Sequence, residues 1–367
     1  MWSAAGRVTI ALQLAVPLTI GGRALLAQGA ADARVGEAEA ETAHRARRLF
    51  REEAPLALTI AADFRAVFAY RDTLKPPRNP ATLTFAADSG PIVVPIELTT
   101  RGHFRLRSST CGFPPLKLHF PKEQLKRTAF AGNGSLKLVT HCDKHPRSEQ
   151  NLLIEYAIYR AYNRLSDLSH RARLARVTYL DTRDSSRTLT RYGFFLEEDK
   201  DMAGRNGGTL FDQAGPASYS EMDSTQMDLV GVFEYLIGNT DWSVIMRHNI
   251  RLVQVPGRDV LYPVAYDFDF SGLVDAGYAR PDPRMPIKSV RERLYRGMCR
   301  PLDELTPTLS RVMAAKDAIT QAFATVPDLD PKRLKDVLAY LDEGFRKIGT
   351  PKSFMAEQEY VCSKTRQ

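Results

Sequence analysis

One stretch in the second half of the chain, residues 238–272, constrains the fold most. Two apolar, β-branched runs, 250–255 and 260–266, are separated by Pro256-Gly257, and this pattern predicts a β-hairpin. Antiparallel pairing brings together the two segments that flank the open end of a hairpin. Both flanking segments are polar, and together they supply three carboxylates and one amide. These residues are Asp241, Asn249, Asp267 and Asp269.

If these side chains converge, their carboxylates concentrate negative charge in a small volume. Carboxylates repel one another and are costly to bury without a cation. Hard oxygen ligands of this kind suit Mg²⁺ or Mn²⁺, so the hairpin predicts a metal site that involves Asn249, Asp267 and Asp269. Taken one at a time, each acid is equally well explained as a turn or capping residue.

The first 33 residues fit the pattern of a secretory signal peptide. Arg7 precedes a short apolar run, and the stretch ends in the small residues Ala30-Ala-Asp-Ala33. A disordered or wrongly assigned start of the chain is the alternative. The signal peptide predicts a periplasmic or secreted protein. No uninterrupted run approaches the ~18 apolar residues of a membrane span.

The four cysteines agree with export. Strands predicted at 114–120 and 135–140 would place Cys111 and Cys142 at the same end of an antiparallel ladder. We therefore expect a Cys111–Cys142 disulfide, which leaves Cys299 and Cys362 for a second bridge. No CxxC spacing occurs, which argues against a zinc site.

The chain has a formal net charge of +8, with its Lys and Arg spread along it rather than gathered in blocks. It has no helix-turn-helix, RNA-binding or zinc-finger pattern. The charge therefore favours a solvated surface, or an attraction for phosphate, over binding to nucleic acid. A monomer is the expected state.

Periodicity divides the remaining chain into a tether and two lobes. A helical or flexible tether is expected at 34–54, a β-rich N-lobe with one main helix at 55–196, and a mostly helical C-lobe at 197–367. Strands are expected at 56–60, 82–85, 92–98, 104–107, 114–120, 135–140, 175–180 and 191–196. This is the order of parts in a two-lobed, protein-kinase-like α+β fold, in which ATP and metal are held between the lobes.

Within that arrangement, Lys137 and Glu155 form the expected phosphate-binding pair. Lys137 stands in the middle of a predicted strand, and Glu155 follows in the next helix. The spacing between them matches the Lys–Glu pair of kinases. Each also has an ordinary explanation, as a solvent-facing strand lysine or as a helix acid that pairs with Tyr159 or Arg160.

Three motifs extend this hypothesis: Gly238-Asn-Thr-Asp241, His248-Asn249 and Tyr266-Asp-Phe-Asp-Phe-Ser-Gly272. Together they resemble the spore-coat CotH type of atypical protein kinase. Weaker matches lie at 99–103, 116–120 and 136–138, so the resemblance spans roughly residues 95–275.

The resemblance implies an exported ATP-dependent phosphotransferase that acts on a hydroxyl group of a protein or small molecule. Asp241 would be the catalytic carboxylate, Asn249 and Asp267 metal ligands, and Lys137 the lysine that contacts the phosphates. Two departures stand out. Met246 occupies the position where most kinase-like loops have Asn, and the DFDFSG motif leaves open whether Asp267 or Asp269 is the main ligand. A kinase-like binding or structural protein without turnover is the alternative.

Overall fold

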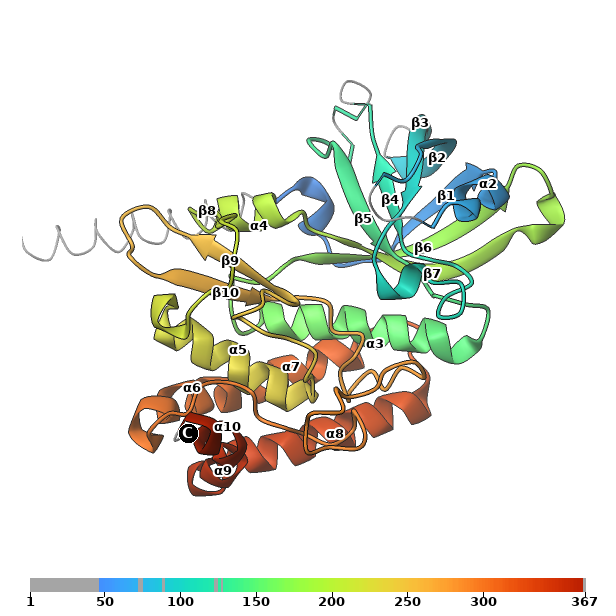
Figure 1. Ribbon diagram of the computed structural model, residues 1–367. Helices are drawn as coiled ribbons and strands as arrows, with labels where there is room; N and C mark the ends of the chain where they lie inside the picture. The colour runs from blue at the N-terminus through green and yellow to red at the C-terminus, as the bar shows by residue number, and fades with distance from the viewer. Residues whose placement is uncertain (1–45, 72–74, 88–89, 122–124, 127, 366–367) are drawn as a thin grey trace, which may run out of the picture. The chain divides into compact units, whose positions relative to one another are not determined.

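Seven strands of the described chain form a closed barrel (Figure 1). The structure is a computed structural model that describes residues 46–71, 75–87, 90–121, 125–126 and 128–365, so the predicted signal peptide and most of the predicted tether lie outside it. The strands are β1 (Leu56–Ala62), β2 (Asn79–Ala87), β3 (Gly90–Thr100), β4 (Leu116–His119), β5 (Ser135–Val139), β6 (Ala172–Asp181) and β7 (Leu189–Leu196). Their order around the barrel is β1-β2-β3-β4-β5-β7-β6.

Alternating side chains fill the interior of the barrel. In β5, Leu136 and Leu138 are fully buried, whereas Lys137 between them lies on the other face and is partly exposed. This is the period of two expected of a strand with one face in a core. The buried cluster includes Leu58, Ile60, Leu83, Phe85, Val94, Ile96, Leu98, Leu116, Leu118, Leu136, Leu138, Val177 and Phe195.

The predicted two-lobed kinase-like fold is wrong, because the strands close on themselves. β1 pairs in parallel with β6, from Leu56 opposite Ala175 to Ala62 opposite Asp181, and this pairing joins the two ends of the sheet. Alternation located most of the strands, but it is a local signal that does not identify partners far apart in sequence. Segment 104–107, predicted as a strand, contains the 3-10 helix η2 (Phe104–Leu106) instead.

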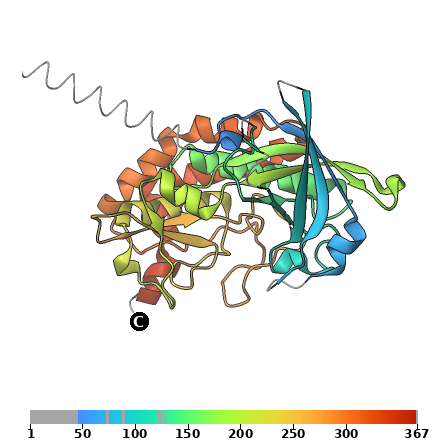
Figure 2. The same cartoon turned by 90° about the horizontal axis from the view of Figure 1, so that it is seen from above.

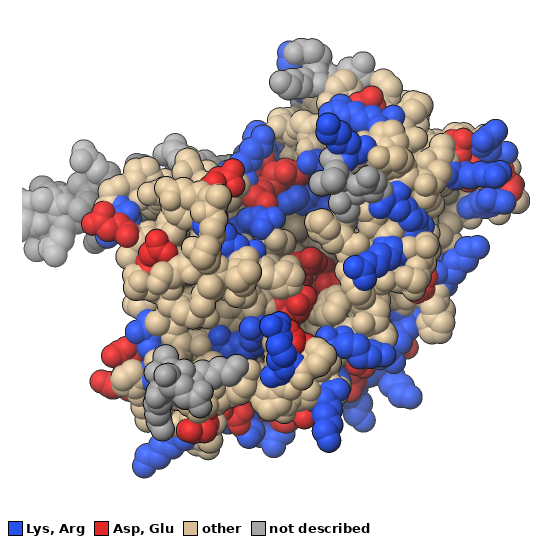
Figure 3. Space-filling model, viewed as in Figure 1, with Lys and Arg blue, Asp and Glu red and all other residues tan. Residues whose placement is uncertain are grey.

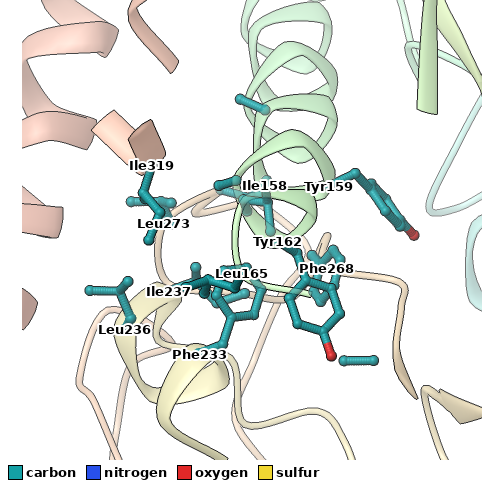
Figure 4. Packing of buried hydrophobic residues seen from close by; sticks show 14 of the residues in the cluster. Ile158, Tyr159, Tyr162, Leu165, Phe233, Leu236, Ile237, Phe268, Leu273 and Ile319 are labelled. Carbon is teal, nitrogen blue, oxygen red and sulfur yellow. The ribbon is translucent and has the colours of Figure 1, made fainter. Parts of the chain in front are cut away.

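One helix, α3 (Pro146–Asn163), lies between the barrel and the other large helices (Figure 1). Its Tyr162 stacks on Phe233 with ring centroids 4.6 Å apart, and its Tyr159 meets the edge of Phe268 at 4.8 Å (Figure 4). This packing fixes Phe268, the residue between two acids of the predicted metal site. The other helices of the described chain are α2 (Phe64–Ala69), α4 (Asp199–Arg205), α5 (Ser224–Ile237), α6 (Leu302–Ala314), α7 (Lys316–Ala324), α8 (Pro331–Ile348), α9 (Pro351–Glu357) and α10 (Glu359–Thr365).

The predicted hairpin is confirmed as strands β9 (Ile250–Gln254) and β10 (Leu261–Ala265). The short strand β8 (Thr209–Leu210) extends it to a three-stranded sheet beside the barrel (Figure 2). Ile250 lies opposite Ala265, and the Tyr266 amide donates to the Asn249 carbonyl at 3.1 Å. The segments that flank the open end of the hairpin are therefore neighbours, as the sequence predicted.

The predicted Cys111–Cys142 disulfide is confirmed, and the remaining pair, Cys299 and Cys362, forms a second bridge. No helix of the described residues is long and apolar enough to cross a bilayer. The two disulfides fit a secreted or periplasmic protein, the setting in which disulfides form and persist.

Loss of the Cys299–Cys362 bridge should lower the free energy of unfolding by about 2–4 kcal/mol, because the bridge closes a long loop that the unfolded chain would otherwise explore. Urea unfolding of the Cys299→Ala/Cys362→Ala variant measures the loss. Peptide mapping of the unreduced parent is the control, and it should show both pairs linked. An unchanged unfolding midpoint would contradict the prediction.

Candidate active site

The open end of the hairpin holds two residues in an unusual backbone conformation. Asn249 and Asp267 have φ angles of 52° and 66°, in the left-handed region of backbone conformation that residues other than glycine seldom adopt. The Asp267 amide donates to the hydroxyl of Tyr159 from α3 at 2.9 Å, which helps to hold this turn. Backbone strain of this kind is concentrated at binding and catalytic sites.

Asp241 is held by the residues that precede β9. The loop that carries it begins at Gly238, which caps α5 with a φ of 67°. A Cβ at this glycine would lie 1.9 Å from the Tyr340 hydroxyl, so another residue would force either the loop or Tyr340 to shift. His248 Nε2 lies 2.9 Å from Asp241 Oδ1, and Asn249 Nδ2 donates to Asp241 Oδ2 at 3.2 Å and to its carbonyl at 2.7 Å. The hydrogen bond that the Asp241 carboxylate accepts from His248 raises the pKa of His248.

A second group of charges lies where α3 meets the loop after β10. Arg105 Nη1 is 3.3 Å from Glu155 Oε2 and 3.9 Å from Asp269 Oδ2, and all three side chains are at most 11 % exposed. Burial raises the pKa of both carboxyl groups, and the nearby charge of Asp267 raises them further. The Tyr278 hydroxyl donates to Asp269 at 2.8 Å. The guanidinium of Arg105 is therefore the cation shared by two buried carboxyl groups, those of Glu155 and Asp269. The charge of a third carboxyl group, that of Asp267, acts on both.

The predicted pairing of Lys137 with Glu155 does not form. Lys137 Nζ lies 2.8 Å from Asp199 Oδ1, and Arg251 Nε donates to Asp199 Oδ2 at 2.7 Å. Burial lowers the pKa of Lys137, and Asp199 opposes this effect. Strand alternation identified the face on which Lys137 lies, but not which acid is opposite. The cation beside Glu155 is Arg105 and not the predicted Lys137.

Sequence reasoning missed Arg105 and Asp199 as members of these charge groups. Arg105 fell in a segment predicted as a plain strand, and Asp199 ended an acidic run that had no predicted partner. A buried Glu in a helix core needs a nearby cation. The burial expected of α3 was the one signal that could have prompted a search for such a cation.

The four acidic and amide residues predicted from the hairpin all line one cleft of about 910 Å³. They are Asp241, Asn249, Asp267 and Asp269. The same cleft is lined by basic side chains, of which Lys117 lies in the barrel strand β4: Arg78, Arg101, Arg105, Lys117, Arg247 and Arg251. Acidic side chains gather in the hollow at the middle of this face, with Lys and Arg around them (Figure 3). The cleft therefore combines acidic side chains with a larger number of basic ones.

A smaller cavity of about 430 Å³ adjoins the cleft. Asp241, His248 and Phe270 line both spaces, so Asp241 stands at their boundary. The smaller cavity has both apolar and basic walls. Its other lining residues include Trp242, Met246, Arg280, Arg284, Met285 and Arg296.

The oxygen donors of the cleft could supply only part of the coordination shell of a hard cation. Among the described residues, no group of three or more His, Cys, Asp or Glu side chains is placed to hold a metal ion. Mg²⁺ often binds through one or two carboxylates together with substrate phosphates, rather than in a cage made by protein alone. Asp267, which is exposed in the cleft, and the buried Asp269 fit that mode of binding.

A scan of protein-family models finds no match for this chain, and a search of curated proteins finds no relative.

Proposed function

We propose that the cleft binds a nucleoside triphosphate with Mg²⁺ or Mn²⁺ and transfers its terminal phosphoryl group to a hydroxyl acceptor in the adjoining cavity. The observation that carries this proposal is the position of Asp241 at the boundary of the two spaces. A carboxylate there can meet an acceptor on one side and a phosphoryl donor on the other. The proposed acceptor class is a hydroxyl on a protein or a small molecule.

The basic side chains that line the cleft would bind the phosphates. Arg101 and Lys117 line it from the segment after β3 and from β4, respectively. Arg251 lines it from β9, and Asp199 connects this arginine to Lys137. Direct contact of Lys137 with phosphate stays a prediction. Charged and bidentate donors of this kind are the usual partners of phosphate oxygens.

The acidic side chains of the cleft would hold the metal and the acceptor. A divalent ion bound by Asp267, Asp269 and the Asn249 amide would neutralise charge on the transferred group. The acceptor oxygen would form a bond to the terminal phosphorus as the bond from phosphorus to the bridging oxygen breaks. That electron pair leaves with the nucleoside diphosphate, and the acceptor proton passes to Asp241. His248 and Asn249 orient the carboxylate through their contacts with it.

Metal binding gives the first test of this proposal. Mn²⁺ at about 100 times its Kd should add about 2.7 kcal/mol to the free energy of unfolding, since it binds only the folded chain. Asp267→Ala should remove this gain, because it removes the exposed carboxylate ligand. The measurement is the melting temperature with and without Mn²⁺ and a non-hydrolysable ATP analogue.

The matched control is Asp275→Ala. Asp275 is also an aspartate with a left-handed backbone, at φ 52°, but it does not line the cleft. Its variant should keep the full response to metal. A full response in Asp267→Ala would refute the metal site. Binding of nucleotide and metal without phosphoryl transfer would instead assign the cleft to a binding protein without turnover.

A further inference from the structure

A second large cavity lies at one rim of the barrel, away from the cleft. It has a volume of about 1030 Å³ and shares no lining residue with the cleft. Its walls come from α2, from the segments on either side of the Cys111–Cys142 bridge, and from the connection between β6 and β7 (Figure 1). The bridge ties two of these walls together, which favours a preformed space.

Aromatic rings form one wall of this cavity. The ring of Phe113 lies 4.7 Å from Phe68, 4.6 Å from Tyr179 and 4.6 Å from His141, between centroids. Phe68 and Phe113 are only partly buried, although phenylalanines in a closed core would be shielded from water. Rings arranged in this way offer flat apolar surface to a ligand.

Two rings in this wall carry polar atoms without a hydrogen-bond partner. Both ring nitrogens of His141 and the hydroxyl of Tyr179 are buried, and none has a partner among the described residues. Each residue is 1 % exposed. Burial, with the nearby charge of Arg191, lowers the pKa of His141 to about 4, so its ring is neutral at physiological pH and has one donor and one acceptor nitrogen. Buried polar atoms are rarely left unpaired, so each such atom calls for an explanation.

The rim of the cavity is more basic than acidic. Its acids are Asp143 and Asp181, whose carboxylates already accept backbone amides at 2.7 Å and 2.9 Å. Four cations line it, Arg65, Lys144, Arg187 and Arg191, of which Arg187 lies 3.0 Å from Asp184 and Arg191 lies 3.9 Å from Glu149. Arg65 and Lys144 therefore supply the positive charge that favours an anionic group at the mouth of the cavity.

We infer that this cavity binds a small amphipathic anion. The ligand has an aromatic or other flat apolar body, a hydroxyl or amide group that pairs with His141 and Tyr179, and a carboxylate or sulfonate that faces the basic rim. Aromatic surface, unpartnered polar atoms and a basic mouth are three independent observations, and each specifies one part of this ligand. The inference goes beyond the proposed phosphoryl transfer and does not depend on it.

Fluorescence titration with anilinonaphthalene sulfonate tests the site, because this probe has an aromatic body, an N–H group and a sulfonate. The folded chain should bind the probe at one saturable site that excess ATP does not displace. Gly112→Trp should abolish binding, since Gly112 lines the cavity and a Cβ there meets nothing within 4 Å. Tyr179→Phe should weaken binding by roughly 2- to 10-fold through loss of one hydrogen bond.

Further measurements separate a binding site from a cavity of no function. Tyr179→Phe should keep or raise the melting temperature of the free protein, because it removes an unpaired buried hydroxyl. Arg65→Gln should weaken the sulfonate probe but not uncharged phenyl-naphthylamine, whereas Arg258→Gln at the exposed hairpin tip should change neither. Circular dichroism confirms that each variant is folded. Unchanged probe affinity in both Gly112→Trp and Tyr179→Phe would overturn the inference, as would displacement of the probe by ATP.

Discussion

Asp241→Asn is expected to slow phosphoryl transfer by about 10²- to 10⁴-fold while nucleotide and metal still bind. The amide keeps the size of the carboxylate and can still contact Asn249, but it cannot accept a proton from the acceptor hydroxyl. Asp241 lies at the boundary of the two cavities, so the loss should fall on kcat more than on nucleotide affinity. Transfer of labelled γ-phosphate to a generic hydroxyl acceptor, with Mn²⁺ and Mg²⁺ tried separately, measures the effect.

Asp259→Asn is the matched control for this substitution. Asp259 is exposed in the connection between β9 and β10, at the opposite end of the same hairpin, and it lines neither cavity. Its variant should transfer phosphate at the parent rate. Parent-like activity in Asp241→Asn would remove this carboxylate from the mechanism, even if the metal response of Asp267 were confirmed.

Arg105→Met should lower the free energy of unfolding by about 3–5 kcal/mol, because it leaves Glu155 and Asp269 buried without their shared cation. Addition of Glu155→Gln should restore much of the loss, since the amide removes one of the two uncompensated carboxyls. Urea unfolding of the parent, both single variants and the double variant gives the coupling free energy between these residues.

The loss in Arg105→Met should depend on pH in a defined direction. Glu155 and Asp269 have raised pKa values in the folded chain, so their protonated forms are favoured on folding. Their contribution to stability is complete below the pKa of the unfolded chain, near 4, and is lost as the pH rises through the raised folded values. Removal of the guanidinium raises those pKa values further. The substitution should therefore cost more near pH 8 than near pH 5.

Arg78→Met controls for the general effect of losing an ion pair. Arg78 lies 2.8 Å from Glu97, but both side chains are about half exposed. Such a surface pair contributes about 0–1 kcal/mol, so this variant should unfold close to the parent. Equal losses in Arg78→Met and Arg105→Met would show that burial of the Arg105 group has no special energetic weight.

Local sequence patterns predicted much of the secondary structure, but they did not predict that the strands close into a barrel. The hairpin followed from two apolar runs around Pro256-Gly257, and the disulfide between Cys111 and Cys142 followed from strand pairing over a short distance. The parallel pairing of β1 with β6 joins segments far apart in the chain, and neither strand has a local pattern that specifies the other. The barrel was therefore beyond what periodicity alone could predict.

The residues of the candidate site were likewise predictable where local pairing brings them together, and not where long-range packing does. Asp241, Asn249, Asp267 and Asp269 flank a single hairpin, so local pairing was enough to bring them to one cleft. Lys137 and Glu155 lie on different elements, and their predicted pairing required the packing of α3 against the barrel. In the structure Arg105 reaches Glu155 and Asp199 reaches Lys137, because elements distant in sequence, the 3-10 helix η2 and the start of α4, supply those partners.

The closure of the barrel through β1 and β6 has a consequence for how the chain acquires its structure. The partner of Leu56 is Ala175, so the first strand has one unpaired edge until the sixth strand has emerged. Unpaired edges attract other strands, and contacts between distant segments form slowly. A chain that emerges from its amino terminus would therefore expose this edge from the time β1 (Leu56–Ala62) appears until β6 (Ala172–Asp181) appears. We expect the chain to need a holding chaperone during that interval, and aggregation before β6 emerges to limit its yield.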